Sequence, residues 1–130
     1  MANRVEKGRR GEAVACEHLR QEGWEVVTTN FECEFGEIDV VARRELVDEQ
    51  AWLVAFVEVK SRRDASEVAP QLSVTARKRR TIARVAKYYA QYHGGPGEGY
   101  RFDVIGVDLG SEPPTVEHFE GAFDARGRPY

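Results

Sequence analysis

One stretch, Trp52-Leu-Val-Ala-Phe-Val-Glu-Val59, is almost continuously apolar and is followed directly by Lys60. Such a run is typical of a β-strand that is covered on both faces, because a half-exposed strand alternates apolar and polar side chains. Glu58 interrupts the run, and an ionised carboxylate in a buried strand is costly unless it is paired or bound to a cation. The stretch therefore predicts a central strand that carries a polar group with a special role.

The segments on both sides of this strand predict a sheet packed between helices. Runs of β-branched residues indicate strands, and apolar residues with a helical period indicate helices. Three consecutive strands can pair antiparallel, and a following helix allows a parallel crossover, so we expect an α/β fold with a central mixed sheet flanked by helices. The expected elements are a helix at about 8–22, strands at 24–30, 36–43 and 52–59, a helix at about 75–93, strands at 100–109 and 115–119, and loops at 44–51 and 62–71.

The 130 residues fit a single domain, residues 1–130, for which we expect a basic N-terminal arm at 1–7 and a loose tail at 121–130. No apolar run is long enough for a spanning helix, and no secretory h-region is present, so no membrane association is expected. Cys16 and Cys33 lack the spacing of a zinc site or of a disulfide scaffold. This favours packing roles for both cysteines and a reducing, cytoplasmic location.

The charges are distributed unevenly along the chain, although the formal net charge is only −3. Between Lys60 and Lys87, nine basic residues face two acidic ones, so this segment carries +7 and the remainder carries −10. A local positive field attracts phosphates whatever the net charge, so the acidic total does not exclude a nucleic-acid partner. A solvated helix face is the alternative interpretation. A second basic patch consists of Arg4, Lys7, Arg9 and Arg10.

Three acidic residues lie in segments that are otherwise expected to be buried. Glu12 lies within the apolar stripe of the first helix, Asp39 interrupts Gly36-Glu-Ile-Asp-Val-Val41, and Glu58 interrupts the central strand. Glu58 and Lys60 project from the same face of their strand, and Asp39 joins them if the two strands are neighbours. Clustered carboxylates suit a hard cation such as Mg²⁺ or Mn²⁺, and an adjacent lysine can position a metal-bound water. A same-face ion pair at a strand end is the structural alternative.

The long helix separates most of its cations from its apolar residues. A step of about 100° per residue places four of them on one side, where we expect them to bind a nucleic-acid backbone. Lys78 falls in the apolar arc and points inward, either toward a substrate phosphate or past the edge of the core. The candidate nucleic-acid-binding residues are Lys78, Arg77, Arg80, Arg84, Lys87, Arg9, Arg10 and Arg62.

Four segments in this order resemble a known family. They are Gly8-Arg-Arg-Gly11-Glu12, Gly36-Glu-Ile-Asp39, Phe56-Val-Glu-Val-Lys60 and Arg101-Phe-Asp-Val104. Together they resemble the uncharacterised bacterial YraN-type family, which is similar to the archaeal Holliday-junction resolvases of the restriction-endonuclease-like PD-(D/E)xK group. The similarity extends from about Gly8 to Phe123.

This resemblance implies a restriction-endonuclease-like three-layer core and a nuclease site. It makes Asp39 and Glu58 metal ligands, Lys60 the catalytic lysine and Glu12 an additional acidic residue, and it matches Lys78 to a basic position of the helix. We therefore expect a Mg²⁺- or Mn²⁺-dependent endonuclease that acts on DNA, with branched or structured DNA as a candidate substrate. A homodimer would suit a symmetric substrate.

Two other interpretations use the same basic surface. One is a nucleic-acid-binding module of this fold without catalytic activity, and the other is a protein-interaction domain that binds an acidic partner through the +7 segment. The sequence has no His-Asn-His nuclease pattern, no G-x-S-x-G elbow and no Walker A motif, so these other hydrolase and nucleotide-binding classes are not expected.

Overall fold

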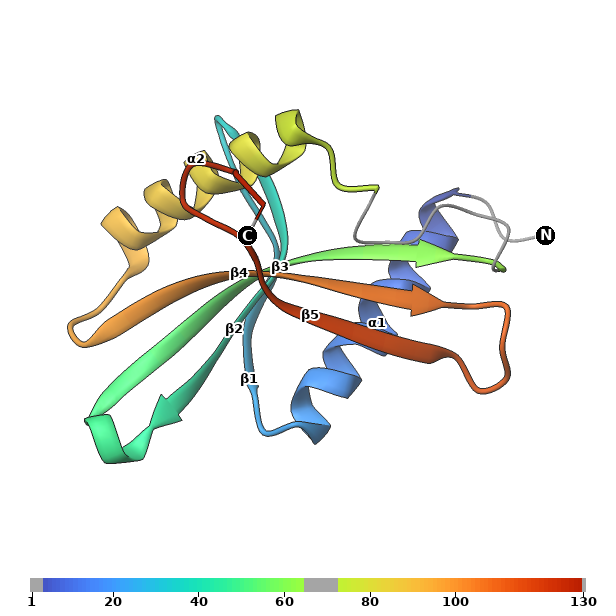
Figure 1. The fold of residues 1–130 in the computed structure, drawn as a ribbon, viewed down its shortest axis with the longest axis horizontal. Helices are drawn as coiled ribbons and strands as arrows, with labels where there is room; N and C mark the ends of the chain where they lie inside the picture. Colours follow the sequence, from blue (N-terminus) through green and yellow to red (C-terminus); the bar gives the residue numbers. More distant parts are fainter. Residues whose placement is uncertain (1–3, 65–72, 130) are drawn as a thin grey trace.

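The computed structural model describes residues 4–64 and 73–129, and for residues 4–7 the backbone alone. Helices and strands account for most of this part of the chain (Figure 1). The elements are α1 (Arg4–Gln21), β1 (Glu25–Cys33), β2 (Gly36–Leu46), the 3₁₀ turn η1 (Val47–Glu49), β3 (Ala51–Arg62), α2 (Ala76–His93), β4 (Glu98–Asp108) and β5 (Thr115–Phe123).

The strands form one mixed sheet in the order β1-β2-β3-β4-β5. Strands β3 and β4 are parallel, and the remaining neighbours are antiparallel. Helix α2 is the crossover between the parallel pair, and the two helices cover opposite faces of the sheet (Figure 1). The predicted α/β class with a central mixed sheet and flanking helices is therefore confirmed.

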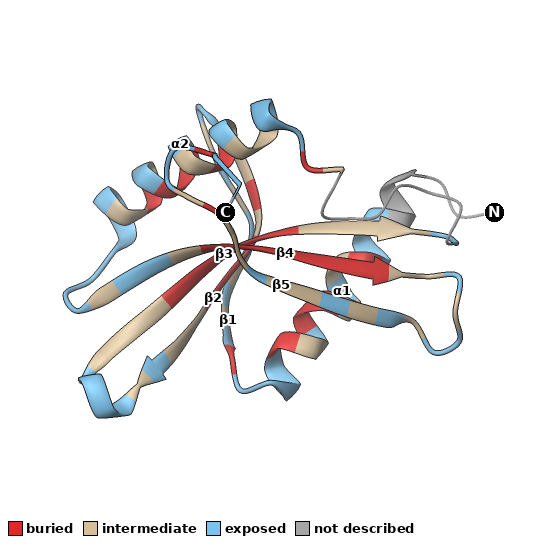
Figure 2. Cartoon of the chain, viewed as in Figure 1, coloured by how far each residue is buried: buried red, intermediate tan, exposed pale blue. Residues whose placement is uncertain are grey.

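Strand β3 is buried on both faces, as its continuous apolar sequence predicts. The middle of β3, from Val54 to Glu58, is buried (Figure 2). Alternate side chains of this stretch pack toward α2 and toward α1. On the α2 side, Phe56 packs with Val85. On the α1 side, Val57 packs with Leu19. The sheet thus separates two apolar layers, each closed by one helix.

Three predicted boundaries are wrong. The loop expected at 44–51 is instead the end of β2, the short turn η1 and the start of β3, because the strands continue pairing as far as Leu46 and Ala51. Residues 4–7 belong to helix α1 and do not form an arm. The expected loose tail begins inside β5, where Phe123 is buried, and Gly127 packs against α2 and accepts a hydrogen bond from Arg79 Nε at 2.8 Å. Most of the loop expected at 62–71 lies outside the described residues.

The helices carry many charged residues, and both cysteines pack against the core. Within the described residues, neither helix is long and apolar enough to span a membrane. Cys16 is buried in the apolar layer under α1, and the partly buried Cys33 packs against the layer under α2. Both thiols are free and fill space in the core.

A buried charged network ties β4 to β5. Asp103 is fully buried, and Arg101 donates two hydrogen bonds of 2.8 Å to its carboxylate. His118 Nε2 lies 2.7 Å from Asp103 Oδ2, and the Gly121 amide donates at 3.0 Å to Oδ1. Burial raises the pKa of Asp103, but these hydrogen bonds outweigh it and hold the pKa below its ordinary value of 3.8. The sequence showed Asp103 only as part of a motif, without a role.

We expect Asp103→Ala to lower the free energy of unfolding by about 3–5 kcal/mol, because Arg101 and His118 lose a buried ionic partner. Urea denaturation at neutral pH measures this loss. Because folding lowers the pKa of Asp103, the ionised group stabilises the protein above pH 3.8 and this contribution disappears as the pH falls further. The exposed Asp48→Ala in η1 is the matched control, and an equal loss in both variants would contradict a structural role for the network.

Candidate metal and nucleic-acid site

Glu12 reaches the sheet because α1 approaches β3 closely at the preceding residue. Gly11 is buried, and a Cβ atom at this position would overlap the Ser61 side chain of β3. Glycine therefore permits the short distance between helix and strand. Glu12 is partly buried as a result, and Asn30 Nδ2 of β1 donates a hydrogen bond of 3.2 Å to its carboxylate. The position of Glu12 within the apolar stripe was read correctly from the sequence.

Asp39 lies where β2 bends. Ile38 packs in the layer under α2, whereas Val40, two residues later, packs in the layer under α1, so the regular alternation of side chains is broken at Asp39. On the neighbouring strand, Asn30 has a positive φ of 53°, which asparagine tolerates better than most residues. Just beyond the last β2–β3 pair, the Asp39 carboxylate accepts a hydrogen bond of 2.8 Å from the Val59 amide. The bend thus presents Asp39 beside β3.

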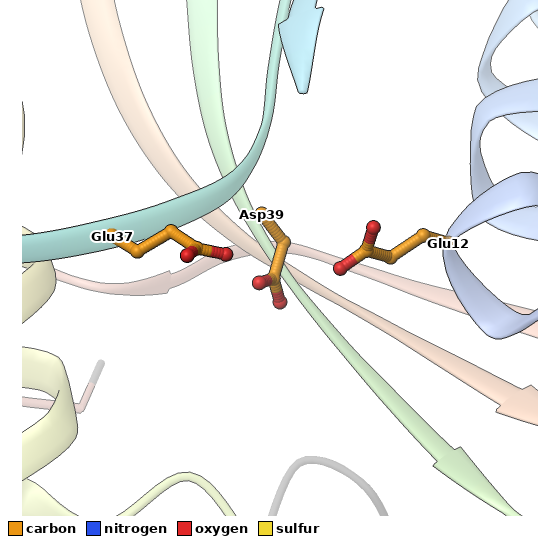
Figure 3. Close-up of side chains that lie close together, drawn as sticks. All are labelled: Glu12, Glu37 and Asp39. Atoms are coloured by element: carbon orange, nitrogen blue, oxygen red, sulfur yellow. The ribbon is translucent and has the colours of Figure 1, made fainter. Parts of the chain in front are cut away.

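Three carboxylates converge at this bend. Carboxylate oxygens of Glu12, Glu37 and Asp39 all lie within 4.8 Å of one another. Glu12 comes from α1 and Glu37 from β2, and they point toward Asp39 from opposite sides (Figure 3). Sequence patterns did not single out Glu37, although its position two residues before Asp39 on a strand was a usable signal. We call Glu12, Glu37 and Asp39 the carboxylate cluster.

The surroundings of the carboxylate cluster disfavour the ionised form of its carboxyl groups. Burial raises the pKa of Glu12 above its usual value, and the neighbouring Asp39 and Glu37 raise it further, against the hydrogen bond from Asn30. Burial and the charge of Asp39 likewise raise the pKa of Glu37. Like charges at this distance disfavour ionisation of each other. A cation bound among them would remove this penalty.

Glu58 is the most strongly perturbed carboxyl group of the site. Its side chain is 5% exposed, and Oε2 has no hydrogen-bond partner among the described residues. Burial raises the pKa of Glu58 to about 8, and the charge of Asp39 and a hydrogen bond with its side chain act in the same direction. Lys78 Nζ lies 4.0 Å from Glu58 Oε2 and, with Lys60, opposes this rise. An unpaired, buried carboxylate oxygen beside Asp39 is an unused ligand position.

The remaining predicted residues lie around this centre. Lys60 is partly buried on β3, two residues beyond Glu58, and Lys78 points inward from the first turn of α2 as helical periodicity predicts. Arg62 Nε lies 3.5 Å from Asp108 Oδ2, so this cation is engaged in an ion pair with β4. The other candidate nucleic-acid-binding residues are exposed, on α2 at Arg77, Arg80, Arg84 and Lys87 and on α1 at Arg9 and Arg10.

The donor set fits a hard divalent cation. All candidate ligand atoms are carboxylate oxygens, which Mg²⁺ and Mn²⁺ prefer over the nitrogen and sulfur ligands of zinc sites. The unpaired Oε2 of Glu58 adds a fourth carboxylate next to the carboxylate cluster. The ligands would therefore be Asp39, Glu12 and Glu37, with Glu58 on the β3 side.

Comparison with known proteins places these residues within one family. The model of the family described as "Uncharacterised protein family UPF0102" matches residues 11–107, a range that includes Glu12, Glu58 and Lys78. A UPF0102 protein from Myxococcus xanthus is 43% identical over 95% of this chain and 94% of its own length. Similar proteins from Syntrophotalea carbinolica and Anaeromyxobacter dehalogenans are 40% and 38% identical, over 95% and 94% of this chain and 96% and 87% of their own lengths.

The perturbed Glu58 predicts a characteristic pH dependence of stability in the presence of EDTA. Between its ordinary pKa of 4.5 and about 8, the folded protein keeps a proton that the unfolded chain has lost, so stability falls as the pH rises through this range. We expect Glu58→Gln to reduce this decline and to be more stable at pH 8 by an amount on the order of a few kcal/mol. Thermal melts at pH 5 and pH 8 measure the effect. The exposed Glu49→Gln is the control, and parallel pH profiles of wild type and Glu58→Gln would contradict the assignment.

Proposed function

The chain belongs to the uncharacterised protein family UPF0102, so its activity must be inferred from its site, and we propose a divalent-metal-dependent endonuclease that hydrolyses phosphodiester bonds in DNA. The observation that carries this proposal is the convergence of Glu12, Glu37 and Asp39 within 4.8 Å beside the buried Glu58, whose Oε2 has no hydrogen-bond partner among the described residues. A purely structural role does not account for four neighbouring carboxyl groups, of which Glu12, Glu37 and Glu58 have a raised pKa beside the charge of Asp39.

Asp39 and Glu58 have the best-defined roles as ligands. Asp39 is held by the Val59 amide, so its second oxygen can face a cation without a change of backbone. Glu58 cannot rotate into solvent, because its strand is buried on both faces. Glu12 and Glu37 complete the set from α1 and β2. A bound Mg²⁺ or Mn²⁺ would supply positive charge for the phosphate and would acidify a water ligand.

Two lysines would act on the reacting phosphodiester. We assign Lys60 to orient the attacking water, because it lies on the same strand as Glu58 and its charge acts on Glu58. Lys78 lies 4.0 Å from Glu58 Oε2, and we assign it to the phosphate, where it would offset the negative charge that develops during hydrolysis. This arrangement supports the restriction-endonuclease-like core that the family resemblance implies.

Helix α2 favours a nucleic acid as the substrate. It contains six Lys and Arg residues and no acidic residue, and its exposed cations begin one residue before Lys78. A phosphate backbone along this surface would pass close to the carboxylate cluster. The salt dependence of binding should therefore be steep, because each neutralised phosphate releases counterions.

A cleavage assay on linear, forked and four-way DNAs tests the proposal. We expect metal-dependent products from the wild type. Asp39→Asn should lose at least roughly a hundredfold in rate, because a residue that binds the metal directly matters at least as much as the groups that orient such residues. Glu37→Gln should lose roughly tenfold or more, which tests the ligand that sequence patterns did not reveal. The exposed Asp48→Asn in η1 should cleave like the wild type.

Two results would contradict this site. Cleavage that survives both Asp39→Asn and Lys60→Ala would place the activity elsewhere. Salt-sensitive DNA binding without cleavage in Mg²⁺ or Mn²⁺, combined with no calorimetric Mn²⁺ binding, would instead support a binding module without catalytic activity.

A further inference from the structure

Three aromatic side chains form a continuous surface at the tip of the β1–β2 hairpin. Phe35 lies in the turn of the hairpin, and Tyr88 and Tyr92 lie in the second half of α2. The ring centroids of Phe35 and Tyr88 are 6.4 Å apart, and those of Tyr88 and Tyr92 are 4.6 Å apart. Figure 1 shows the hairpin tip beside α2. We call Phe35, Tyr88 and Tyr92 the aromatic platform.

The aromatic platform is exposed and surrounded by cations. Phe35 is 38% exposed and Tyr92 is 62% exposed, although large apolar side chains are usually buried. The guanidinium of Arg84 lies 4.6 Å from the Phe35 ring centroid, and the exposed Lys87 lines the same hollow of about 400 Å³. Glu34 is the acidic residue that lines this hollow.

Close packing of the hairpin backbone against α2 fixes the position of Phe35. Gly36 has a positive φ of 143°, and a Cβ atom there would lie 2.7 Å from Thr81 Cγ2 of α2. The hairpin is therefore packed closely against the helix at this residue. This contact holds Phe35 next to Arg84 and Tyr88, and it lies at the first residue of β2, directly before Glu37.

We propose that the aromatic platform binds the unpaired bases of a single-stranded DNA segment, which deepens the proposed function and rests on it. Aromatic side chains next to cations match the two components of single-stranded nucleic acid, flat bases and a negative backbone. A duplex offers phosphates but keeps its base faces stacked inside, so it uses only the cations. The substrate class is therefore DNA with a single-stranded portion, such as a flap, a fork or a gap.

The path from the aromatic platform to the carboxylate cluster follows α2. Lys78 beside Glu58 and Tyr88 in the platform are ten residues apart, which corresponds to about 15 Å along a helix axis. The spacing of the exposed cations along this path, three, four and three residues, keeps them on one side of the helix. These cations are Arg77, Arg80, Arg84 and Lys87. A strand whose bases stack on the platform can thus extend its phosphates toward the cluster.

Fluorescence anisotropy of labelled oligo(dT) and of a duplex of equal length, measured with the full chain in EDTA, tests the inference without cleavage. We expect Phe35→Ala and Tyr92→Ala each to weaken oligo(dT) binding by roughly tenfold and to leave duplex binding nearly unchanged. Phe35→Tyr and Tyr92→Phe should retain the affinity, whereas Phe35→Leu should not, because it keeps apolar area and loses the aromatic face. Tyr100→Ala on β4 is the matched control, since Tyr100 is 40% exposed and lies outside the platform.

The outcomes separate this inference from the proposed nuclease. Unchanged oligo(dT) binding in Phe35→Ala and Tyr92→Ala would overturn it. An equal loss of oligo(dT) affinity in Tyr100→Ala, or wild-type oligo(dT) affinity of Phe35→Leu, would also overturn it. A change in self-association by sedimentation, with unchanged DNA affinity, would overturn it in favour of an interface between copies. Platform-dependent binding without cleavage by any form would refute the nuclease alone, whereas cleavage without platform-dependent binding would refute the platform alone.

Discussion

The hydrogen bond from the Val59 amide to Asp39 is the interaction on which the site depends. It forms where β2 and β3 stop pairing, immediately beyond the contact of Val40 with Val57. A backbone amide that would otherwise remain unpaired is satisfied by a carboxylate, and the carboxylate is fixed between the two strands. Without this bond, the bend of β2 would leave Asp39 free to turn toward solvent. With it, the Asp39 carboxylate has a fixed position between those of Glu37 and Glu12.

The burial of β3 adds a second constraint. Glu58 follows four consecutive buried residues, so its side chain has little freedom to reach water. Its position beside Asp39 therefore follows from strand pairing, and its raised pKa follows from that position. The positive charges of Lys78 and Lys60 offset only part of the rise in the pKa of Glu58. Lys78 is directed toward Glu58 by the start of α2, where Thr75 caps the helix by accepting a hydrogen bond from the Lys78 amide at 3.1 Å.

Much of this arrangement could be predicted from short-range sequence patterns. The continuous apolar run identified β3 as central, and helical periodicity placed Glu12 and Lys78 on inward-facing sides, because both signals depend only on residues within one element. The alternation rule failed at β2. The bend at Asp39 changes which side chains face which layer, and a positive φ at Asn30 cannot be recognised from residue type alone. Glu37 was missed because its grouping with Glu12 and Asp39 depends on the packing of α1 against the sheet, which is a contact between residues distant in sequence.

The wrong predictions for residues 44–51 and for the C-terminal tail have a related origin. The polar and acidic composition of 44–51 suggested a loop, but pairing with the neighbouring strand extends β2 and β3 through half of it. Residues 121–129 looked loose because they have little apolar periodicity, yet one residue, Phe123, anchors them in the core and Arg79 holds Gly127. In both cases, contacts with residues distant in sequence decide the outcome, and composition carries no information on them.

The separation of charge across the molecule connects these constraints. The carboxylates gather at the bend of β2, whereas the exposed cations lie along α2. Lys78, in the first turn of α2, and Lys60, on β3, lower the pKa of Glu58. Like charges collected in this way destabilise the protein in isolation, since the charge of Asp39 raises the pKa of Glu12, Glu37 and Glu58. Such an arrangement is maintained where it serves a ligand of the opposite charge. On the proposed function, a divalent cation would satisfy the carboxylates, a nucleic-acid backbone would satisfy the cations of α2, and the phosphate between them is the one group that both halves of the site would contact.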